Sequence, residues 1–339
     1  MRTITFSVVA VAVIGLGGPG ATPAAAQAPG AAGGGAAAAP EWTPPRTPWG
    51  DPDLQGIYTN KDESGIPMEK PDELGVSAPE ELDDSEFADI IRERNQRTEE
   101  RAPLAGGITG AGPTHWYENY NARNSRLWLV VDPPDGRIPS LTPEAEARAA
   151  LRDAERAAST RGPSDSFVDR SLYDRCISLG VPGSMTPKIY GNSYEIYQAP
   201  GFVAIRYEMV HETRIIPLDD RPHVGAAIRQ YTGDARGRWE GNTLVVETRN
   251  FHPAINNRGA TAGLALVERF TPVAPDKLEW SVTYDDPNTW TRPWTFAMQL
   301  TKDPTQAVFE YACHEGNYGL RNILSAARAE EAGAREEGR

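Results

Sequence analysis

The chain has 339 residues and a formal net charge of −13, with 47 acidic side chains against 34 basic ones. An acidic field repels the phosphates of nucleic acids and the anionic surfaces of membranes, so the composition disfavours both as partners. The sequence has only two cysteines and five histidines, without a CxxC or HExxH pattern. We therefore expect neither a metal ion nor a cofactor.

The first 26 residues have the pattern of a secretory signal peptide. Arg2 precedes an apolar run from Ile4 to Leu16, and three alanines at 24–26 offer a cleavage site. Residues 27–44 are rich in Ala, Gly and Pro, which is typical of a disordered leader. No later apolar run is long enough for a membrane-spanning helix. We predict an exported protein, periplasmic or secreted, with a single domain over 45–328 and a disordered charged tail at 329–339.

Two helical insertions are predicted within this domain. Over residues 79–101 apolar side chains recur at helical spacing, and Ser77 is the candidate N-cap. Over residues 142–160 the sequence opens with Thr-Pro-Glu, which places a good N-cap before a proline at the first helical position. A further helix is expected around 320–329.

The rest of the domain is strand-like. Residues 125–131 predict one strand, and from Tyr190 to the segment AVFEYACHE at 307–315 alternating runs are separated by short turns rich in Gly, Pro, Asn and Asp. Such alternation indicates an antiparallel sheet with one buried face. About eight such strands predict a mainly β fold, an antiparallel up-and-down β-barrel with peripheral helices, because closure removes exposed edges. A sandwich remains the alternative, and the pattern leaves open which face points inward.

Cys176 and Cys313 lie far apart in the sequence. In an oxidising compartment such a pair is more often a disulfide than two free thiols. Closing so long a loop contributes about 4–5 kcal/mol in the chain-entropy model. Neighbouring side chains of an extended strand point to opposite faces, so a catalytic dyad of Cys313 with His314 is disfavoured.

Three histidines are candidates for acid or base chemistry. His211 and His223 flank a segment that contains Arg214 and Arg221, and His314 ends the last expected strand. Arginine would hold a carboxylate or another anion while histidine transfers a proton. The alternative interpretation is that these residues only make hydrogen bonds at turns and strand ends.

Charged side chains on the strand faces would line a ligand cavity if those faces point inward, and would form weak surface ion pairs if they point to solvent. The loop at 285–294 adds tryptophans beside carboxylates, a combination suited to stacking a flat ligand. An aromatic stretch at 115–117 is a further candidate. The predicted ligand-binding residues are Arg206, Glu208, Arg214, Arg221, Glu247, Arg269, Trp290 and Arg292.

Several ordered motifs together resemble a large, uncharacterised family of secreted bacterial proteins that often occurs in many copies per genome. The resemblance spans residues 44–328 and implies export and a common architecture, without an assigned reaction. The motifs are PWGDPDLQGIY (48–58), LVVDPPDGRIPSLTPEAEAR (129–148), DRCISLGVPG (174–183), HETRIIPLDDRPH (211–223), GDARGRWEGNTLVVETRNF (233–251), ALVERF (265–270), DDPNTWTRPWT (285–295) and YACHEGNYGLRNIL (311–324).

A shorter stretch, DLQGIY at 53–58, is similar to the start of the first strand of lipocalins, with Tyr58 where Trp is usual. This resemblance agrees with the predicted barrel and implies that the barrel is lipocalin-like.

These observations favour an exported small-molecule-binding protein with a ligand cavity in its β-barrel and a small organic molecule as its partner. One alternative is a periplasmic acid/base enzyme, a hydrolase or lyase that uses a His–carboxylate pair on the same scaffold. Another is a structural domain with a filled interior. An enzyme requires a histidine within hydrogen-bond reach of a carboxylate, inside a pocket.

Overall fold

One large antiparallel sheet dominates the structure, a computed structural model that describes residues 42–76, 81–105, 125–255 and 257–337. The strands are β1 (Gly56–Thr59), β2 (Val130–Asp132), β3 (Ser193–Ala199), β4 (Phe202–Tyr207), β5 (Thr213–Pro217), β6 (Asp234–Glu240), β7 (Thr243–Arg249), β8 (Ala265–Ala274), β9 (Lys277–Asp285) and β10 (Trp294–Lys302). The helices are α1 (Asp84–Ala105), α2 (Pro143–Ala158) and α3 (Tyr318–Glu337).

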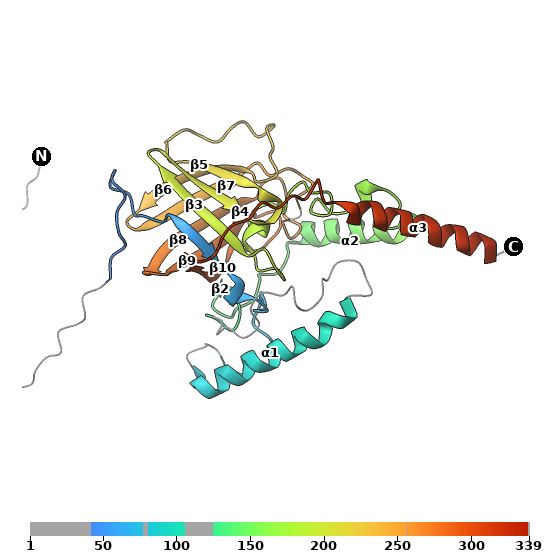
Figure 1. Cartoon of the computed structure of the whole chain (residues 1–339), viewed down its shortest axis with the longest axis horizontal. Helices are drawn as coiled ribbons and strands as arrows, with labels where there is room; N and C mark the ends of the chain where they lie inside the picture. The colour runs from blue at the N-terminus through green and yellow to red at the C-terminus, as the bar shows by residue number, and fades with distance from the viewer. Residues whose placement is uncertain (1–41, 77–80, 106–124, 256, 338–339) are drawn as a thin grey trace, which may run out of the picture. The chain divides into compact units, whose positions relative to one another are not determined.

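The sheet curls into a nearly closed barrel of nine strands, which confirms the predicted fold class. The strand order is β5-β4-β3-β1-β10-β9-β8-β7-β6, and the short β2 pairs with β10 outside this path (Figure 1). Strands β3–β5 and β6–β10 are two up-and-down runs, as the alternation predicted. The first strand of the chain, β1, joins the two runs because it pairs with both β3 and β10.

The apolar faces of the strands point into the barrel. On β9, Leu278, Trp280, Val282 and Tyr284 are buried, whereas the alternating residues such as Glu279 lie outside. Large side chains fill the interior, and burying each of them contributes about 1.5–3 kcal/mol. The largest fully buried ones include Trp280, Trp294, Tyr194, Tyr207, Phe270 and Phe296.

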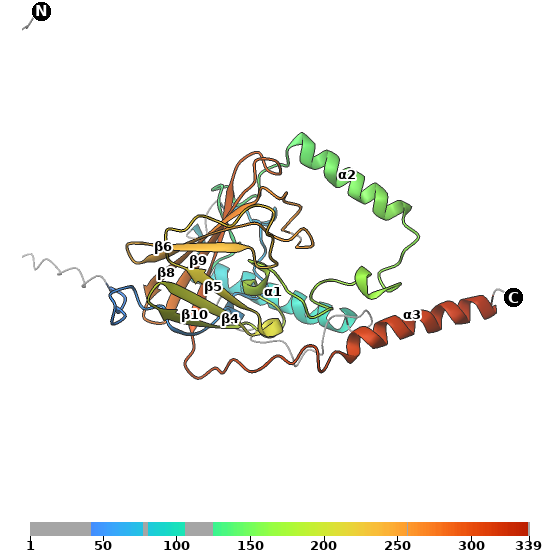
Figure 2. The same cartoon turned by 90° about the horizontal axis from the view of Figure 1, so that it is seen from above.

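The two ends of the strand path, β5 and β6, lie next to each other without a hydrogen-bonded ladder (Figure 2). We call this boundary the seam. Every neighbouring pair along the nine-strand path is antiparallel, so the first and last strands run in the same direction. Parallel neighbours need a long crossover connection. Residues 218–233, the crossover segment, provide it.

Side chains close the seam from the inside. Arg214 on β5 reaches Glu268 on β8 with two hydrogen bonds of 2.5 and 3.1 Å, and both residues are almost completely buried. A Cβ atom at Gly237 on β6 would lie 2.7 Å from Leu218 and 2.8 Å from Ile216. Glycine at this position therefore lets β6 approach β5 closely.

The two ends of the barrel differ in their connections. At the hairpin end, two-residue turns at 200–201, 241–242 and 275–276 join successive strands. At the opposite end, which we call the loop end, residues 250–264 join β7 to β8 and residues 286–293 join β9 to β10. Because binding residues are found disproportionately on loops, a binding site is expected at the loop end.

The predicted helices are present with adjusted bounds. Helix α2 begins after Thr142, whose hydroxyl accepts a hydrogen bond from Ala145 N, so the predicted N-cap is confirmed. Helix α1 begins at Asp84, and the proposed cap Ser77 lies outside the described residues. Helix α3 begins at Tyr318 and extends well beyond 329, to Glu337.

The strand predicted at 307–315 is wrong, and the one at 125–131 shrinks to β2. The chain cannot return as a hairpin beside β10, because β9 pairs with one side of β10 and β1 and β2 pair with the other. Instead, residues 303–317 form an irregular strap. Its contacts include a hydrogen bond from Arg206 Nη2 to Val308 O (2.9 Å), and the predicted disulfide between Cys313 and Cys176 is present.

Candidate functional site

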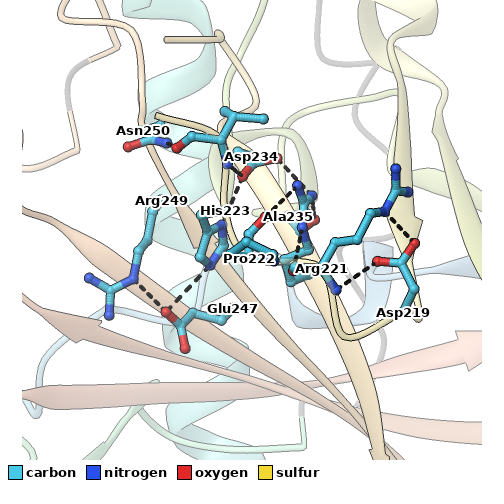
Figure 3. Close-up of polar contacts among 11 residues, drawn as sticks. Asp219, Arg221, Pro222, His223, Asp234, Ala235, Glu247, Arg249 and Asn250 are labelled. Carbon is cyan, nitrogen blue, oxygen red and sulfur yellow. Dashed lines mark hydrogen bonds and ion pairs between the residues drawn. The ribbon is translucent and has the colours of Figure 1, made fainter. Parts of the chain in front are cut away.

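A cluster of charged side chains fastens the crossover segment to the outside of the seam (Figure 3). His223 Nδ1 donates to Asp234 Oδ2 at 2.9 Å, and the same oxygen accepts Val224 N. Arg236 Nη1 binds the other oxygen, Oδ1, at 2.7 Å. Asp234 is buried because it begins β6 under the crossover segment, and its three donors compensate its charge.

The second carboxylate of this cluster is Glu247 on β7. Its Oε1 lies 3.5 Å from His223 Nε2 and accepts a hydrogen bond from Arg249 Nε. That hydrogen bond, with the charges of Arg249 and His223, holds the pKa of Glu247 below its usual value. The second nitrogen of His223 therefore faces a carboxylate that is already paired with Arg249. The cluster thus joins β6, β7 and the crossover segment in one ion network.

The other predicted ligand-binding residues do not converge on one place. Arg206 pairs with Glu195 across the outer face of β3 and β4, and Arg269 on β8 pairs with Glu240 at the end of β6. The remaining five lie in five further settings. Glu208 accepts Ser193 N, Arg214 is inside the barrel, Arg221 pairs with Asp219, Arg292 pairs with Asp132, and Trp290 is buried against Tyr284 and Trp294.

The histidines at 211 and 314 are both exposed at the loop end. His211 Nδ1 lies 2.6 Å from Tyr311 O, so this side chain holds the strap. His314 lies in a turn just after Cys313. Only His223 has a carboxylate within hydrogen-bond reach among these three candidates. The aromatic stretch at 115–117 lies outside the described residues.

A pocket of about 360 Å³ opens at the loop end, between the β7–β8 connection and the crossover segment. Two of its lining residues, Phe251 and Leu264, belong to the hydrophobic core cluster, so the floor of the pocket is the mouth of the filled barrel. The lining combines apolar and polar side chains: Arg229, Phe251, His252, Pro253, Ile255, Asn257, Ala260, Thr261, Ala262 and Leu264.

A buried carboxylate, Asp286, fixes one wall of this pocket. It accepts Thr261 N at 2.6 Å and Thr261 Oγ1 at 3.1 Å, together with Thr289 Oγ1 and Asn288 N. Burial alone would raise the pKa of Asp286, but these hydrogen bonds outweigh it and hold the pKa below its usual value. The β9–β10 turn thereby anchors the β7–β8 connection.

Two lining side chains have defined hydrogen-bonding roles. His252 packs on the ring of Tyr231 at 4.6 Å between centroids, and its Nδ1 accepts Ala254 N at 3.1 Å. Because Nδ1 is the acceptor, the proton of the neutral ring is on Nε2, which is a donor. Arg229 donates to Phe251 O at 3.3 Å.

Sequence analysis missed Arg229, His252 and Asp234, and it included Asp286 only as one of the carboxylates of the candidate loop at 285–294. Nothing in their spacing distinguishes them from turn residues. Their role depends on contacts across the loop end between segments far apart in the chain.

Comparisons with known proteins give little guidance. No family model matches the chain, and no curated protein matches it. A crystal structure of a secretory abundant heat soluble (SAHS) protein from Ramazzottius varieornatus aligns with 39% of this chain and 87% of its own length, at 15% identity and a TM-score of 0.24. These values carry no inference about function.

The described part of the chain contains neither a membrane-spanning helix nor a cluster of metal-binding side chains. None of its helices has the length and apolarity needed to cross a membrane. The described His, Cys, Asp and Glu side chains do not gather in groups of three that suit a metal ion.

Proposed function

We propose that the protein binds a small organic molecule in the pocket at the loop end of its barrel. The observation that carries this proposal is the pocket of about 360 Å³ over a filled interior. Ligand pockets range from roughly 300 to 1,000 Å³ and combine an apolar lining with a few polar groups. This pocket has that composition, at the small end of the range.

A thermal-shift screen against sugars, aromatic acids and lipids tests the proposal, since a ligand that prefers the native state raises the melting temperature. Ala262 lines the pocket, and Ala262→Trp is expected to abolish the shift by filling it. Ala157→Trp, the same change on the exposed surface of α2, serves as the matched control and keeps the shift. Equal shifts in both variants would place the ligand elsewhere.

We also propose that the protein is exported and belongs to the secreted bacterial family that its motifs resemble. The signal-peptide pattern at the N-terminus and the bond between Cys176 and Cys313 support export, because disulfides persist in oxidising compartments. Fractionation of cells that express the full chain tests this. We expect mature protein in the periplasm or medium, with an N-terminus near residue 27.

An acid/base enzyme is the second candidate, favoured by the contact of 2.9 Å between His223 and Asp234. Such a dyad uses Asp to orient the imidazole and the other nitrogen to transfer a proton. A panel of esters and other hydrolase and lyase substrates tests it. Turnover lost in His223→Gln but kept in His314→Gln would support this function, and no turnover in the unmodified protein would exclude it for the panel.

A further inference from the structure

We propose that the pocket selects a small carboxylic acid with an apolar, ring-shaped body, and that Arg229 binds the carboxylate. This inference rests on the proposed function and specifies its ligand. It follows from three features of the pocket: the charges in its lining, the partners of Arg229 and the state of His252.

The described residues that line the pocket include no carboxylate, although the whole chain carries a net charge of −13. Asp286 is a carboxylate that contacts the lining, and its oxygens accept four hydrogen bonds from the protein. Thr261, which lines the pocket, donates its hydroxyl to Asp286. A bound anion therefore meets a wall whose negative charge is already compensated.

Arg229 differs from the arginines of the neighbouring charged cluster. In the neighbouring cluster each arginine has a carboxylate partner: Arg221 with Asp219, Arg236 with Asp234, and Arg249 with Glu247. Among the described residues, Arg229 has no such partner, and it donates to the carbonyl oxygen of Phe251 at 3.3 Å. A guanidinium has five N–H donors in a planar fork, so most of them remain for a ligand.

The remaining polar groups of the lining also favour an acceptor. His252 uses Nδ1 as an acceptor, which leaves the Nε2 proton as its donor. Asn257 adds an amide. The N–H donors of His252 and Asn257 lie in the same lining as the guanidinium of Arg229. Together they match the two oxygens of a carboxylate better than a hydroxyl, an amine or a sugar.

The apolar part of the lining defines the body of the ligand. Phe251, Ile255, Leu264 and Pro253 line the pocket together with two alanines. The ring of Phe251 suits an aromatic or alicyclic ligand, because aromatic rings pack well in offset or edge-to-face geometry. At about 360 Å³, the pocket fits one small ring acid and not a long lipid chain.

Isothermal titration with a matched pair of probes tests this inference. Phenylacetate carries the charge, and phenylacetamide has the same shape without it. We expect phenylacetate to bind at least about tenfold more tightly, because hydrogen bonds to a charged group are much stronger than neutral ones. Arg229→Gln is expected to remove about that factor, and Arg229→Lys to recover part of it. Arg238→Gln removes the same charge on the exposed face of β6 and should leave the affinity unchanged.

The outcomes separate this inference from the proposed function. If the acid and the amide bind equally, or if Arg229→Gln and Arg238→Gln behave alike, the carboxylate assignment is wrong while the pocket stays a binding site. If neither probe binds but another compound in the thermal screen gives a shift that Ala262→Trp abolishes, the ligand class is wrong and the proposed function holds. Melting temperatures of the variants without ligand show whether Arg229→Gln disturbs the fold.

Discussion

Different kinds of ion pair hold the seam between β5 and β6 on its inner and outer sides. On the inside, Arg214 and Glu268 form a two-point ion pair that is 2% and 0% exposed. On the outside, His223, Asp234 and Glu247 tie the crossover segment to β6 and β7 in a network that is partly open to solvent. Charges removed from water interact strongly but are costly to leave unpaired, whereas exposed pairs are screened. The contrast predicts that substitutions inside the seam lower the free energy of unfolding much more than substitutions on its outer side.

The largest effect is expected inside the seam. Glu268→Leu leaves the guanidinium of Arg214 buried without its hydrogen-bonded counter-charge, and it also removes the partner of Trp280 Nε1. Breaking such a pair from one side costs about 3–5 kcal/mol. Urea unfolding measures the change in the free energy of unfolding.

The double variant Arg214→Met with Glu268→Leu is the informative control. Because it removes both charges, it should be much less destabilised than Glu268→Leu alone. If the two are equally unstable, the loss comes from packing around β8 and the ion pair does not dominate the seam.

The next effect is expected at the buried carboxylate on the outer side. Asp234→Asn keeps the shape but weakens three hydrogen bonds, from His223, Val224 N and Arg236. Hydrogen bonds to a charged group contribute about 1.5–3 kcal/mol, so we expect a loss of that order. The same change at the exposed Asp219 should alter the free energy of unfolding by less than about 1 kcal/mol. Equal losses of stability at Asp234 and Asp219 would show that burial of the carboxylate does not determine the size of the effect.

Acid should weaken the outer network at Glu247. Its pKa is lowered in the folded state by Arg249 first and by His223 as well, so its contribution is complete above the unfolded pKa of about 4.3. It is lost as the pH falls through the lower folded pKa. Glu247→Gln is therefore expected to be less stable than wild type by up to about 1 kcal/mol at neutral pH, with the difference vanishing near pH ~2. Glu330→Gln, on α3, is the exposed control, and a pH-independent difference for Glu247→Gln would contradict this assignment.

Much of the barrel could be predicted from the sequence, since its information is local. The alternation on β9 and β10 and the Thr-Pro-Glu start of α2 specify period and boundary within a few residues. The failed strand at 307–315 had similar alternation, but strand pairing depends on a free edge elsewhere in the sheet. The alternation of apolar and polar residues does not show whether the sheet has a free edge for the strand to pair with.

The candidate site was less predictable than the fold. The sequence singled out His223 and Glu247 for their chemistry, and the structure brings them together. It did not single out Asp234, because an Asp before a strand is ordinary turn chemistry, nor Arg229, whose distinguishing feature is the absence of a nearby described carboxylate. A missing partner is a property of three-dimensional surroundings and leaves no trace in the order of residues.

The smallest effect on stability is expected for Arg221→Gln. Its side chain pairs with Asp219 on an exposed surface, and such pairs contribute about 0–1 kcal/mol. Its main-chain oxygen accepts Arg236 Nε at 3.2 Å whatever the side chain, so the crossover segment keeps its attachment to β6. Arg236→Gln removes that attachment and a partner of Asp234, and urea unfolding should place it well below Arg221→Gln in stability. If Arg221→Gln proves the less stable of the two, the exposed ion pair and not the backbone contact holds the outer side of the seam.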